Sequence, residues 1–485
     1  MTEKQIQSAI ASQRNLFITG AAGTGKSTRL QELIDKTENV LVCAPTGIAA
    51  LHIGGETAHK VFHIPVPAYE APSFAKKKKG ALTESMLKTL KEADMVIIDE
   101  ISMFKNSDFE FAMKVLHKAE RLAGKKIRVI VSGDFSQLPP VVKKTEEKLM
   151  KKFGFDLSGF AFTSKEWKKL NFKVVELTEV KRQSDKEFIT ELNKVRCGDT
   201  SSYDYFNQFV SENPDYTDAI CICGTNAEAE KINNEYLNEL PGADRALRAE
   251  KFGRVSAMNV NEIIVVKEGA QVVFTANDMR GNRFQNGSFG IVKGFYEDKV
   301  IVTVGGKDVF VEKQKVSAYS YQVTGNQLQK KEIGYINQYP FQLGKAITIH
   351  KSQGQTFEKV VIQPTIFAAG QLYVALSRVK SPEGLTLTKP VTPEDFRIHE
   401  VVEQFYKDGY TYEVSEKKKV IKSTTTKKTT KKSAGTAKKT TKKTTVSKTS
   451  KSVAKKSTTK KTTSTKTRTG AKSARAKAAK KPVRK

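Results

Sequence analysis

The stretch Leu16–Ser27 (LFITGAAGTGKS) decides how the neighbouring parts of the chain can fold. Its first residues, LFIT, form a short and mainly apolar run, as in a buried parallel strand. The following GAAGTGKS matches the pattern GxxxxGK[ST], in which glycines let backbone N–H groups surround phosphate oxygens at the N-terminus of a helix. We expect this helix from Lys26 to about Asp35, with Lys26 reaching the outer phosphates and Ser27 holding a magnesium ion. The stretch therefore predicts an α/β domain that binds a nucleotide.

A second apolar run, Met95–Ile98 (MVII), ends in the pair Asp99 and Glu100. A carboxylate at the end of a parallel strand beside a phosphate loop can hold magnesium through water, and its neighbour can act as general base for an attacking water. Most Asp-Glu pairs in proteins are solvated surface charges. Because this pair follows four apolar residues, the pattern favours a catalytic role and hydrolysis of the nucleotide.

A third run, Ile127–Val131, stops at Gly133 and is followed by Asp134, Gln137 and two prolines (GDFSQLPP). The carboxyl ends of parallel strands lie on the ligand side of a sheet, so Asp134 and Gln137 are expected to face the same phosphates. The neutral amide of Gln137 can bond to water and phosphate alike and would sense the γ-phosphate. The alternative is an ordinary turn that Asp134 caps.

The positive charge of the chain is concentrated at one end. Its 485 residues suggest two to four domains. Residues 417–485 contain 27 of the 83 lysines and arginines and no acid, which leaves 56 basic against 52 acidic residues elsewhere. Such a Lys-, Thr-, Ser- and Ala-rich tail cannot bury enough apolar area to fold, so we expect 414–485 to be disordered. Its charge favours nonspecific binding of nucleic acid; a solubilising role, an acidic protein partner and a membrane surface are the alternatives.

The composition argues against several other classes of protein. The cysteines, at positions 43, 197, 221 and 223, are too few and too irregular for a disulfide framework or a zinc site. No apolar run approaches the length of a membrane span, and the polar beginning MTEKQ lacks the pattern of a signal or transit peptide. We therefore expect reduced thiols and no membrane contact.

Seven motifs occur in a characteristic order: GAAGTGKS, APTGIAALHIGGETAH, IIDEISM, GDFSQLPP, LTEVKRQ, AITIHKSQGQTF and YVALSR. In this order they resemble the motifs of B-type superfamily-one DNA helicases, closest to the Pif group and similar to RecD and Dda enzymes. The resemblance covers residues 1 to about 387. It implies an α/β fold with two RecA-like P-loop NTPase domains that clamp ATP between them. It also implies DNA-stimulated ATP hydrolysis that drives 5′-to-3′ movement on single-stranded DNA and duplex unwinding, in DNA replication, repair or recombination.

The resemblance also implies site residues, with ATP and Mg²⁺ as cofactors. Gln5 would read the adenine, and Arg182 and Arg378 would point from the second domain at the γ-phosphate, where their charge stabilises the transferring group. The implied catalytic residues are Lys26, Asp99, Glu100, Gln137, Arg182 and Arg378. The implied ATP-binding residues are Gln5, Gly20, Ala21, Ala22, Gly23, Thr24, Gly25, Lys26, Ser27 and Thr28, and the metal ligands are Ser27 and Asp99.

The implied DNA-binding residues are Thr46, His59, Phe62, Thr348, His350, Lys351 and Thr356. Their hydroxyl, imidazole and ammonium groups suit phosphate and sugar contacts that carry no sequence information. The ring of Phe62 could stack on a base or pack in the core, and both alternatives stay open. The expected partners are single-stranded and forked DNA, with the chain acting as a monomer.

The resemblance divides the chain into a first domain (1–173) with a wedge insertion at about 64–84, a second domain (174–413) and the tail (414–485). In the wedge, Tyr69, Phe74 and Lys76–Lys79 would meet the duplex fork; a solvated loop is the alternative. Strand-like segments with glycine turns from Gln271 to Val316 predict a small antiparallel barrel. Family members carry an SH3-like barrel there, which corresponds to about 288–340.

Three interpretations of the function remain. The first is an ATP-driven DNA-unwinding motor. The second is a translocase, or a remodeller of protein–DNA complexes, that separates little duplex by itself. The third is a nucleic-acid packaging protein in which the tail dominates. The expected location is intracellular: cytoplasmic and nucleoid-associated if the source is bacterial or viral, with a nuclear location as the alternative.

Overall fold

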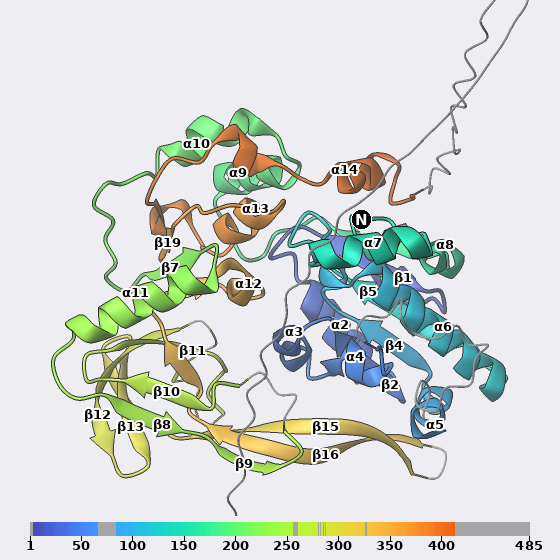
Figure 1. Cartoon of the computed structure of the whole chain (residues 1–485), viewed down its shortest axis with the longest axis horizontal. Helices are drawn as coiled ribbons and strands as arrows, with labels where there is room; N and C mark the ends of the chain where they lie inside the picture. Colours follow the sequence, from blue (N-terminus) through green and yellow to red (C-terminus); the bar gives the residue numbers. More distant parts are fainter. Residues whose placement is uncertain are drawn as a thin grey trace, which may run out of the picture. The chain divides into compact units, whose positions relative to one another are not determined.

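The computed structural model describes residues 3–65, 84–255, 260–279, 281, 283, 284, 286, 288–324 and 327–412. The expected wedge residues Tyr69, Phe74 and Lys76–Lys79 and the basic tail lie outside these ranges. The described chain contains two α/β lobes, each built on a parallel sheet, and a group of antiparallel strands (Figure 1).

The first lobe is built on a six-stranded parallel sheet with the order β3-β2-β4-β5-β1-β6. All five residues of β1 are buried, as expected for a strand that is covered on both faces. The predicted strands that end in the carboxylates and in Gly133 are β4 and β5, which pair directly with each other. The strands are β3 (Glu56–Thr57), β2 (Val40–Ala44), β4 (Met95–Ile98), β5 (Arg128–Ser132), β1 (Leu16–Gly20) and β6 (Lys173–Leu177).

Strand β6 corrects the expected domain boundary. Its residues 173–177 were expected to open the second domain from position 174. Instead, they pair in parallel with β1 from Leu16↔Lys173 to Gly20↔Leu177, so they belong to the first lobe. A short edge strand of either lobe would have the same sequence pattern, which is why the sequence alone misassigns it.

Helices cover both faces of the first sheet. The predicted helix after the glycine-rich stretch is confirmed as α2, with the expected bounds. The helices are α1 (Glu3–Ala11), α2 (Lys26–Asp35), α3 (Gly47–His52), α4 (Ala58–Val61), α5 (Glu84–Glu92), α6 (Asn106–Ala123), α7 (Lys144–Phe153) and α8 (Lys165–Leu170).

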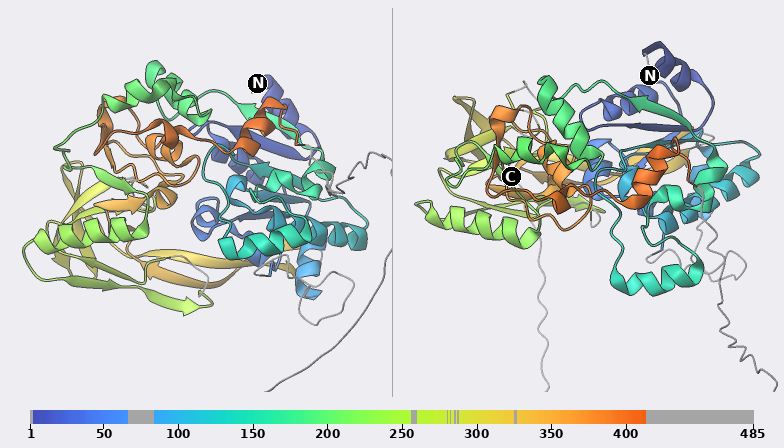
Figure 2. Two further views of the ribbon diagram at one scale, coloured as in Figure 1. Left: turned by 45° about the horizontal axis from the view of Figure 1, so that its top comes forward. Right: turned by 90° about the horizontal axis from the view of Figure 1, so that it is seen from above.

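The chain returns to the first lobe at its last described helix, α14 (Glu400–Lys407). Phe405 of α14 is fully buried in the core of the first lobe and stacks on Phe162, with ring centroids 4.1 Å apart. Burial of such a ring contributes about 1.5–3 kcal/mol. In the views of Figures 1 and 2, α14 lies beside the first lobe although it follows the second lobe in sequence.

The second lobe contains a four-stranded parallel sheet with the order β18-β7-β19-β20. The strands are β7 (Ile220–Cys223), β18 (Ala346–Thr348), β19 (Val360–Ile362) and β20 (Leu385–Leu387). The helices of this lobe are α9 (Lys186–Arg196), α10 (Tyr203–Asn207), α11 (Asn226–Glu239), α12 (Ile349–Ser352) and α13 (Gln371–Leu376).

Antiparallel strands are inserted between α11 and β18. The four segments predicted between Gln271 and Val316 are present as β11 to β14, and β17 completes their five-stranded antiparallel sheet. A two-stranded sheet, β10-β8, and a three-stranded sheet, β15-β16-β9, accompany it. The strands are β8 (Arg245–Arg248), β9 (Glu250–Gly253), β10 (Ile263–Val266), β11 (Gln271–Phe274), β12 (Phe289–Tyr296), β13 (Lys299–Val304), β14 (Lys307–Val311), β15 (Gln314–Thr324), β16 (Gln327–Gln338) and β17 (Phe341–Leu343).

The strands β15 and β16 form a long hairpin that reaches the first lobe (Figure 1). Strand β15 contacts α5, and the ammonium of Lys60 donates to the backbone carbonyl of Tyr319 at 2.9 Å. The sequence analysis did not predict this hairpin. It places part of the antiparallel insertion directly against the helices that follow β2 and β3.

Candidate functional site

The phosphate loop, residues Gly20–Ser27, joins the carboxyl end of β1 to the first turn of α2. Gly25 precedes the helix with φ +84°, a left-handed conformation that favours glycine. At Gly23, an added Cβ would lie 2.5 Å from Cβ of Arg182, so the loop and the segment of Arg182 approach too closely for a side chain. Two of the loop's three glycines, Gly23 and Gly25, therefore have a direct structural reason.

Lys26 folds back onto its own loop. Its Nζ donates to the carbonyl oxygens of Gly20 and Ala21, each at 2.9 Å. Burial lowers the pKa of Lys26, and the carboxylates of Asp134 and Glu100 oppose that shift. Neutral carbonyls are weaker partners for an ammonium than anionic oxygens are, so phosphate oxygens entering the loop would be preferred.

Asp99 and Glu100 follow β4 directly. The carboxylate of Asp99 accepts the backbone N–H of Glu100 at 2.9 Å, and Glu100 has a left-handed φ of +50°. Such a conformation costs a residue other than glycine about 1–3 kcal/mol and is found preferentially at functional sites. Burial and, after it, the nearby charge of Asp99 raise the pKa of Glu100 to about 7. A carboxylate with this pKa can accept a proton from water at neutral pH.

The residues after β5 separate into two roles. Gln137 faces the same cavity as the phosphate loop. Asp134, which was expected to face the phosphates as well, is instead fully buried in a two-bond ion pair with Arg196, at 3.0 and 3.1 Å. Burial alone would raise the pKa of Asp134, but the charges of Arg196 and Lys26 outweigh it and the pKa is lowered. The expectation failed because Arg196 comes from α9, far away in sequence.

A cavity of about 450 Å³ collects side chains from both lobes. From the first lobe, it is lined by most of the phosphate loop, Glu100 and Gln137. From the segments after β6 it is lined by two arginines and two lysines. The full set is Ala22, Gly23, Thr24, Gly25, Lys26, Ser27, Thr28, Glu100, Gln137, Lys181, Arg182, Gly354, Thr356, Arg378 and Lys380. The cavity thus combines five basic side chains with one carboxylate, a balance that suits a polyanion such as a triphosphate.

Four residues that the resemblance assigned to ATP or metal do not line this cavity. Gly20 and Ala21 contribute the carbonyl oxygens that hold Lys26. Asp99 is mostly buried next to Glu100. Gln5, the expected adenine reader, is an exposed residue of α1.

The two arginines of the cavity are held by backbone carbonyls. Arg182 donates to the carbonyl of Ser377 at 3.0 Å. Arg378 is 1% exposed and donates to the carbonyls of Val374, Ser352 and Gln355. Burial and the neighbouring Arg182 lower the pKa of Arg378 to about 9. Two close guanidinium groups repel each other, so an anion between them would relieve the repulsion.

Two tyrosines and Arg196, which the sequence analysis did not identify, support the site. The backbone N–H of Ala22 in the phosphate loop donates to the hydroxyl of Tyr373 at 2.7 Å. The hydroxyl of Tyr406 in α14 donates to Asp134 at 3.0 Å, and its ring lies 5.3 Å from the guanidinium of Arg196. Tyr373 lies inside the motif YVALSR and could have been singled out there, whereas Arg196 and Tyr406 belong to no motif.

Several residues expected to bind DNA have local structural partners. Thr46 caps α3 by accepting the N–H of Ala49 at 3.2 Å, and Thr348 caps α12 by accepting the N–H of Lys351 at 3.3 Å. His59 lies 3.6 Å from the carboxylate of Asp108. These contacts fix where the side chains lie. The capping hydroxyls each retain a hydrogen that can be donated to a phosphate.

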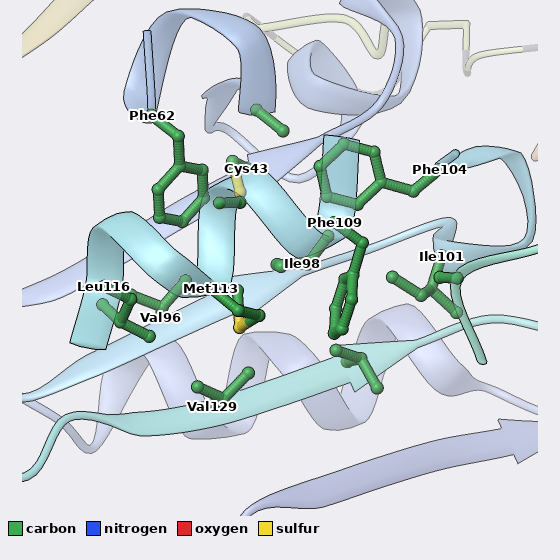
Figure 3. Packing of buried hydrophobic residues seen from close by; sticks show 14 of the residues in the cluster. Cys43, Phe62, Val96, Ile98, Ile101, Phe104, Phe109, Met113, Leu116 and Val129 are labelled. Atoms are coloured by element: carbon green, nitrogen blue, oxygen red, sulfur yellow. The ribbon is translucent and has the colours of Figure 1, made fainter. Parts of the chain in front are cut away.

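The structure corrects two of the expected DNA-binding residues. The ring of Phe62 is fully buried and packs among the residues shown in Figure 3, including Cys43 and Phe104. It therefore has no free face on which a base could stack. Thr356 lines the nucleotide cavity rather than a DNA-facing surface. Both were misplaced because a motif identifies residues but not the side of the backbone to which each side chain points.

Lys351 lies on a second cavity of about 160 Å³ between α3 and the antiparallel strands. His52 and Leu51 of α3 form one wall, and Tyr339 and Phe341 lie among the residues of the opposite wall. His350, next to Lys351, is partly buried, which lowers its pKa, so its ring is neutral near pH 7. The expected DNA-binding helix α12 thus borders a groove that contains both polar and aromatic groups.

The described residues lack two further kinds of site. None of the helices in those ranges has the length and apolar character needed to cross a membrane. Within the same ranges, no group of three or more His, Cys, Asp or Glu side chains is arranged to hold a metal ion.

Comparison with known proteins gives consistent matches. A family model described as PIF1-like helicase matches residues 2–205. The ATP-dependent DNA helicase Pif1 of Campylobacter jejuni is 30% identical over 449 residues, which cover 84% of this chain and 97% of that protein. The chain spans a smaller part, 57–63%, of matching mouse and frog (Xenopus laevis) relatives named ATP-dependent DNA helicase PIF1.

Solved structures of similar proteins show the same fold. The structure of Bacteroides sp Pif1 in complex with ADP-AlF4 has a TM-score of 0.75 and 32% identity, covering 84% of this chain and 96% of that chain. A Bacteroides Pif1 bound to ssDNA has a TM-score of 0.60 and 32% identity, covering 84% and 97% of the two chains. The Campylobacter jejuni protein and the Bacteroides structures are matched over nearly their whole length. The chain therefore belongs to the PIF1-like helicase family and is an ATP-dependent DNA helicase.

Proposed function

We propose that the chain moves 5′-to-3′ along single-stranded DNA and unwinds duplexes by hydrolysing ATP in the cavity between its two lobes. The observation that carries this proposal is that Glu100 and Lys26 of one lobe share the cavity with Arg182 and Arg378 beyond it. Closure of the lobes around a triphosphate would bring all four groups to the same phosphates, and hydrolysis would release them. One cycle of closure and opening is then one mechanical step.

Each side chain has a separate task in this proposal. Lys26 exchanges its two carbonyl partners for phosphate oxygens. Glu100, with its pKa near neutrality, takes a proton from the attacking water. Arg182 and Arg378 stabilise the charge that develops on the transferring phosphoryl group. Gln137 senses whether the γ-phosphate is present.

We also propose Mg²⁺ as the accompanying ion, with Ser27 and Asp99 as its side-chain ligands. Hydroxyl and carboxylate oxygens are ligands that Mg²⁺ accepts, and Ser27 lines the cavity while Asp99 lies beside Glu100. When bound, the ion would neutralise charge on the phosphate oxygens. Gln5 is proposed as the contact to adenine.

The proposed DNA contacts are Thr46, His59, Thr348, His350 and Lys351. Their chemistry suits the sugar-phosphate backbone rather than base edges, as sequence-independent movement requires. Solved relatives described as bound to ssDNA and as unwinding forked dsDNA support single-stranded and forked DNA as partners. We propose action in DNA replication, repair or recombination.

The remaining parts extend the motor. We propose that the antiparallel strands form an SH3-like barrel that closes over DNA, and that residues 64–84 contact the duplex fork. The tail, 414–485, is proposed to bind nucleic acid nonspecifically through its lysines. A monomer in an intracellular location, cytoplasmic or nuclear, completes the proposal.

Strand displacement tests the proposal. Two substrates with the same duplex, one with a 5′ and one with a 3′ single-stranded overhang, are incubated with the protein with and without ATP. We expect ATP-dependent displacement on the 5′-overhang substrate only. ATP hydrolysis on single strands with the duplex left paired would favour a translocase, and displacement from the 3′ overhang alone would contradict the proposed direction.

A further inference from the structure

Gln353 joins the two lobes at the general base. It follows α12 and is 7% exposed. Its Nε2 donates to Glu100 at 2.9 Å and to the side-chain oxygen of Gln137 at 3.3 Å. The ionised carboxylate of Glu100, the form that acts as base, can only accept, so the amide nitrogen of Gln353 faces it. One NH₂ group therefore holds the expected base and the expected sensor together.

The other end of the same amide is unsatisfied. Among the described residues, Oε1 of Gln353 is buried and has no hydrogen-bond partner. A buried acceptor without a donor costs free energy, so a glutamine serving only to fill space would be unfavourable here. The role of Gln353 therefore lies in the donor end of its side chain, which makes both hydrogen bonds.

The backbone around Gln353 reaches two further parts of the machinery. Arg378 donates to the carbonyls of Ser352 and Gln355, which flank Gln353 on either side. Two residues earlier, Lys351, one of the proposed DNA contacts, lines the second cavity. A shift of α12 at Lys351 would therefore also move Gln353, which donates to Glu100.

We propose that Gln353 is a positioning residue through which the second lobe holds the carboxylate of Glu100 next to Gln137, so that DNA bound along α12 sets the placement of the general base. This inference rests on the proposed function, because it assumes that Glu100 activates water. It assigns to one side chain the connection between DNA binding and ATP hydrolysis.

The direction of the effect follows from the two hydrogen bonds. The donor of Gln353 holds the carboxylate of Glu100 beside the amide of Gln137. Without this donor, Glu100 loses its hydrogen bond to the second lobe, so bound DNA should stimulate ATP hydrolysis less.

The test measures steady-state ATP hydrolysis by the full chain at a single pH, without DNA and with saturating oligothymidylate. Gln353→Met keeps the length and removes the donor. Gln353→Glu replaces the donor with a second negative charge beside Glu100. The matched control is Gln271→Met, because Gln271 is also buried and donates from one Nε2 to two acceptors, the carbonyls of Ala219 and Gly344, away from the nucleotide cavity.

For Gln353→Met we expect roughly tenfold lower DNA-stimulated kcat near neutral pH, at the low end of what a positioned base contributes, with KM for ATP changed by no more than about twofold. Hydrolysis without DNA should fall much less, so the ratio of DNA-stimulated to basal kcat should drop, and Gln353→Glu should lower this ratio at least as far. Gln271→Met should keep the wild-type ratio. If Gln353→Met loses the folded-state fluorescence of Trp167, the ratio in Gln353→Glu decides the question.

Two outcomes overturn the inference. One is a wild-type DNA-stimulated kcat in a folded Gln353 variant. The other is a loss of kcat that is equal with and without DNA, which would indicate a purely structural role. Neither of these two outcomes contradicts the proposed function if the wild-type protein hydrolyses ATP in the presence of single-stranded DNA. A wild-type protein without this activity would contradict the proposed function itself.

Discussion

Replacing Arg196 by methionine should destabilise the first lobe, because it leaves the carboxylate of Asp134 buried without its main partner. The side chains of Arg196 and Asp134 are 14% and 0% exposed, and two hydrogen bonds of 3.0 and 3.1 Å join them. Removing one member of a buried ion pair costs about 3–5 kcal/mol. Ser136 and Tyr406 still donate to Asp134, so we expect a loss at the low end, about 3 kcal/mol.

Urea unfolding followed by tryptophan fluorescence measures this loss. Trp167 is the single tryptophan of the chain, and its ring lies 5.7 Å from that of Phe135, next to Asp134 in sequence. With a slope of about 2–3 kcal/mol per molar urea, a loss of about 3 kcal/mol lowers the midpoint by about 1–1.5 M. The double variant Arg196→Met with Asp134→Asn should recover much of the loss, since it no longer buries an unpaired charge.

Two results would refute this reasoning. A loss below about 1 kcal/mol in Arg196→Met would place the pair among weak, solvent-screened ion pairs. A double variant no more stable than Arg196→Met would show that the unpaired charge of Asp134 is not the cause. An Arg121→Met variant, which replaces an exposed arginine in the last turn of α6, controls for the general effect of replacing an arginine.

Three further predictions concern single side chains. Lys26→Ala should lower ATP hydrolysis by about 10²-fold or more, because the phosphates lose their ammonium; unchanged turnover would exclude the phosphate loop as the site. Gln137→Ala should keep nucleotide binding but consume ATP without strand displacement, and retained coupling of hydrolysis to displacement would disprove its sensing role. His117 lies between Glu120 (2.9 Å) and Glu166 (3.2 Å), and the hydrogen bond to Glu120, against burial, raises its pKa above 6.5. Its stabilising contribution is therefore complete below pH 6.5 and is lost as pH rises through the raised pKa, so the difference in unfolding free energy between wild type and His117→Gln should fall with pH; a difference independent of pH would rule this out.

The sequence was most informative where a local pattern carries chemistry. The glycine-rich stretch and its flanking elements were predicted: the helix has the observed bounds of α2, and the strand, expected over Leu16–Thr19, is one residue longer in β1. Glu100 and Gln137 were expected at one edge of the sheet because parallel strands end there, and both line the cavity. The arginines at positions 182 and 378 came from the family resemblance alone, since an isolated arginine has no distinguishing pattern.

The features that the sequence analysis did not predict depend on contacts between distant segments of the chain. The partner of Asp134 is the last residue of α9, and no local pattern links the two. The long hairpin was missed because Gln327–Gln338 (QLQKKEIGYINQ) alternates poorly between apolar and polar residues. Gln353 belongs to a recognised motif, but only the closeness of the two lobes shows which side chain it touches.

Phe62 illustrates the limit of a motif. Its position beside the expected DNA-facing residues suggested a stacking role. Its ring is nevertheless enclosed by the first lobe, since the four-residue helix α4 turns it inward. The direction of a side chain on so short a helix depends on packing, which the sequence pattern does not encode.

The most direct test of the central claim is ATP hydrolysis by Arg182→Ala, measured with single-stranded DNA alongside the binding of a nucleotide. The claim is that groups beyond the first lobe complete the site at which the phosphate loop holds ATP. We predict that kcat falls about 10³-fold, as on loss of an arginine that stabilises phosphoryl transfer, while nucleotide affinity changes by less than about tenfold. Hydrolysis within about threefold of wild type would contradict the claim, because it would show that the first lobe cleaves ATP without this arginine.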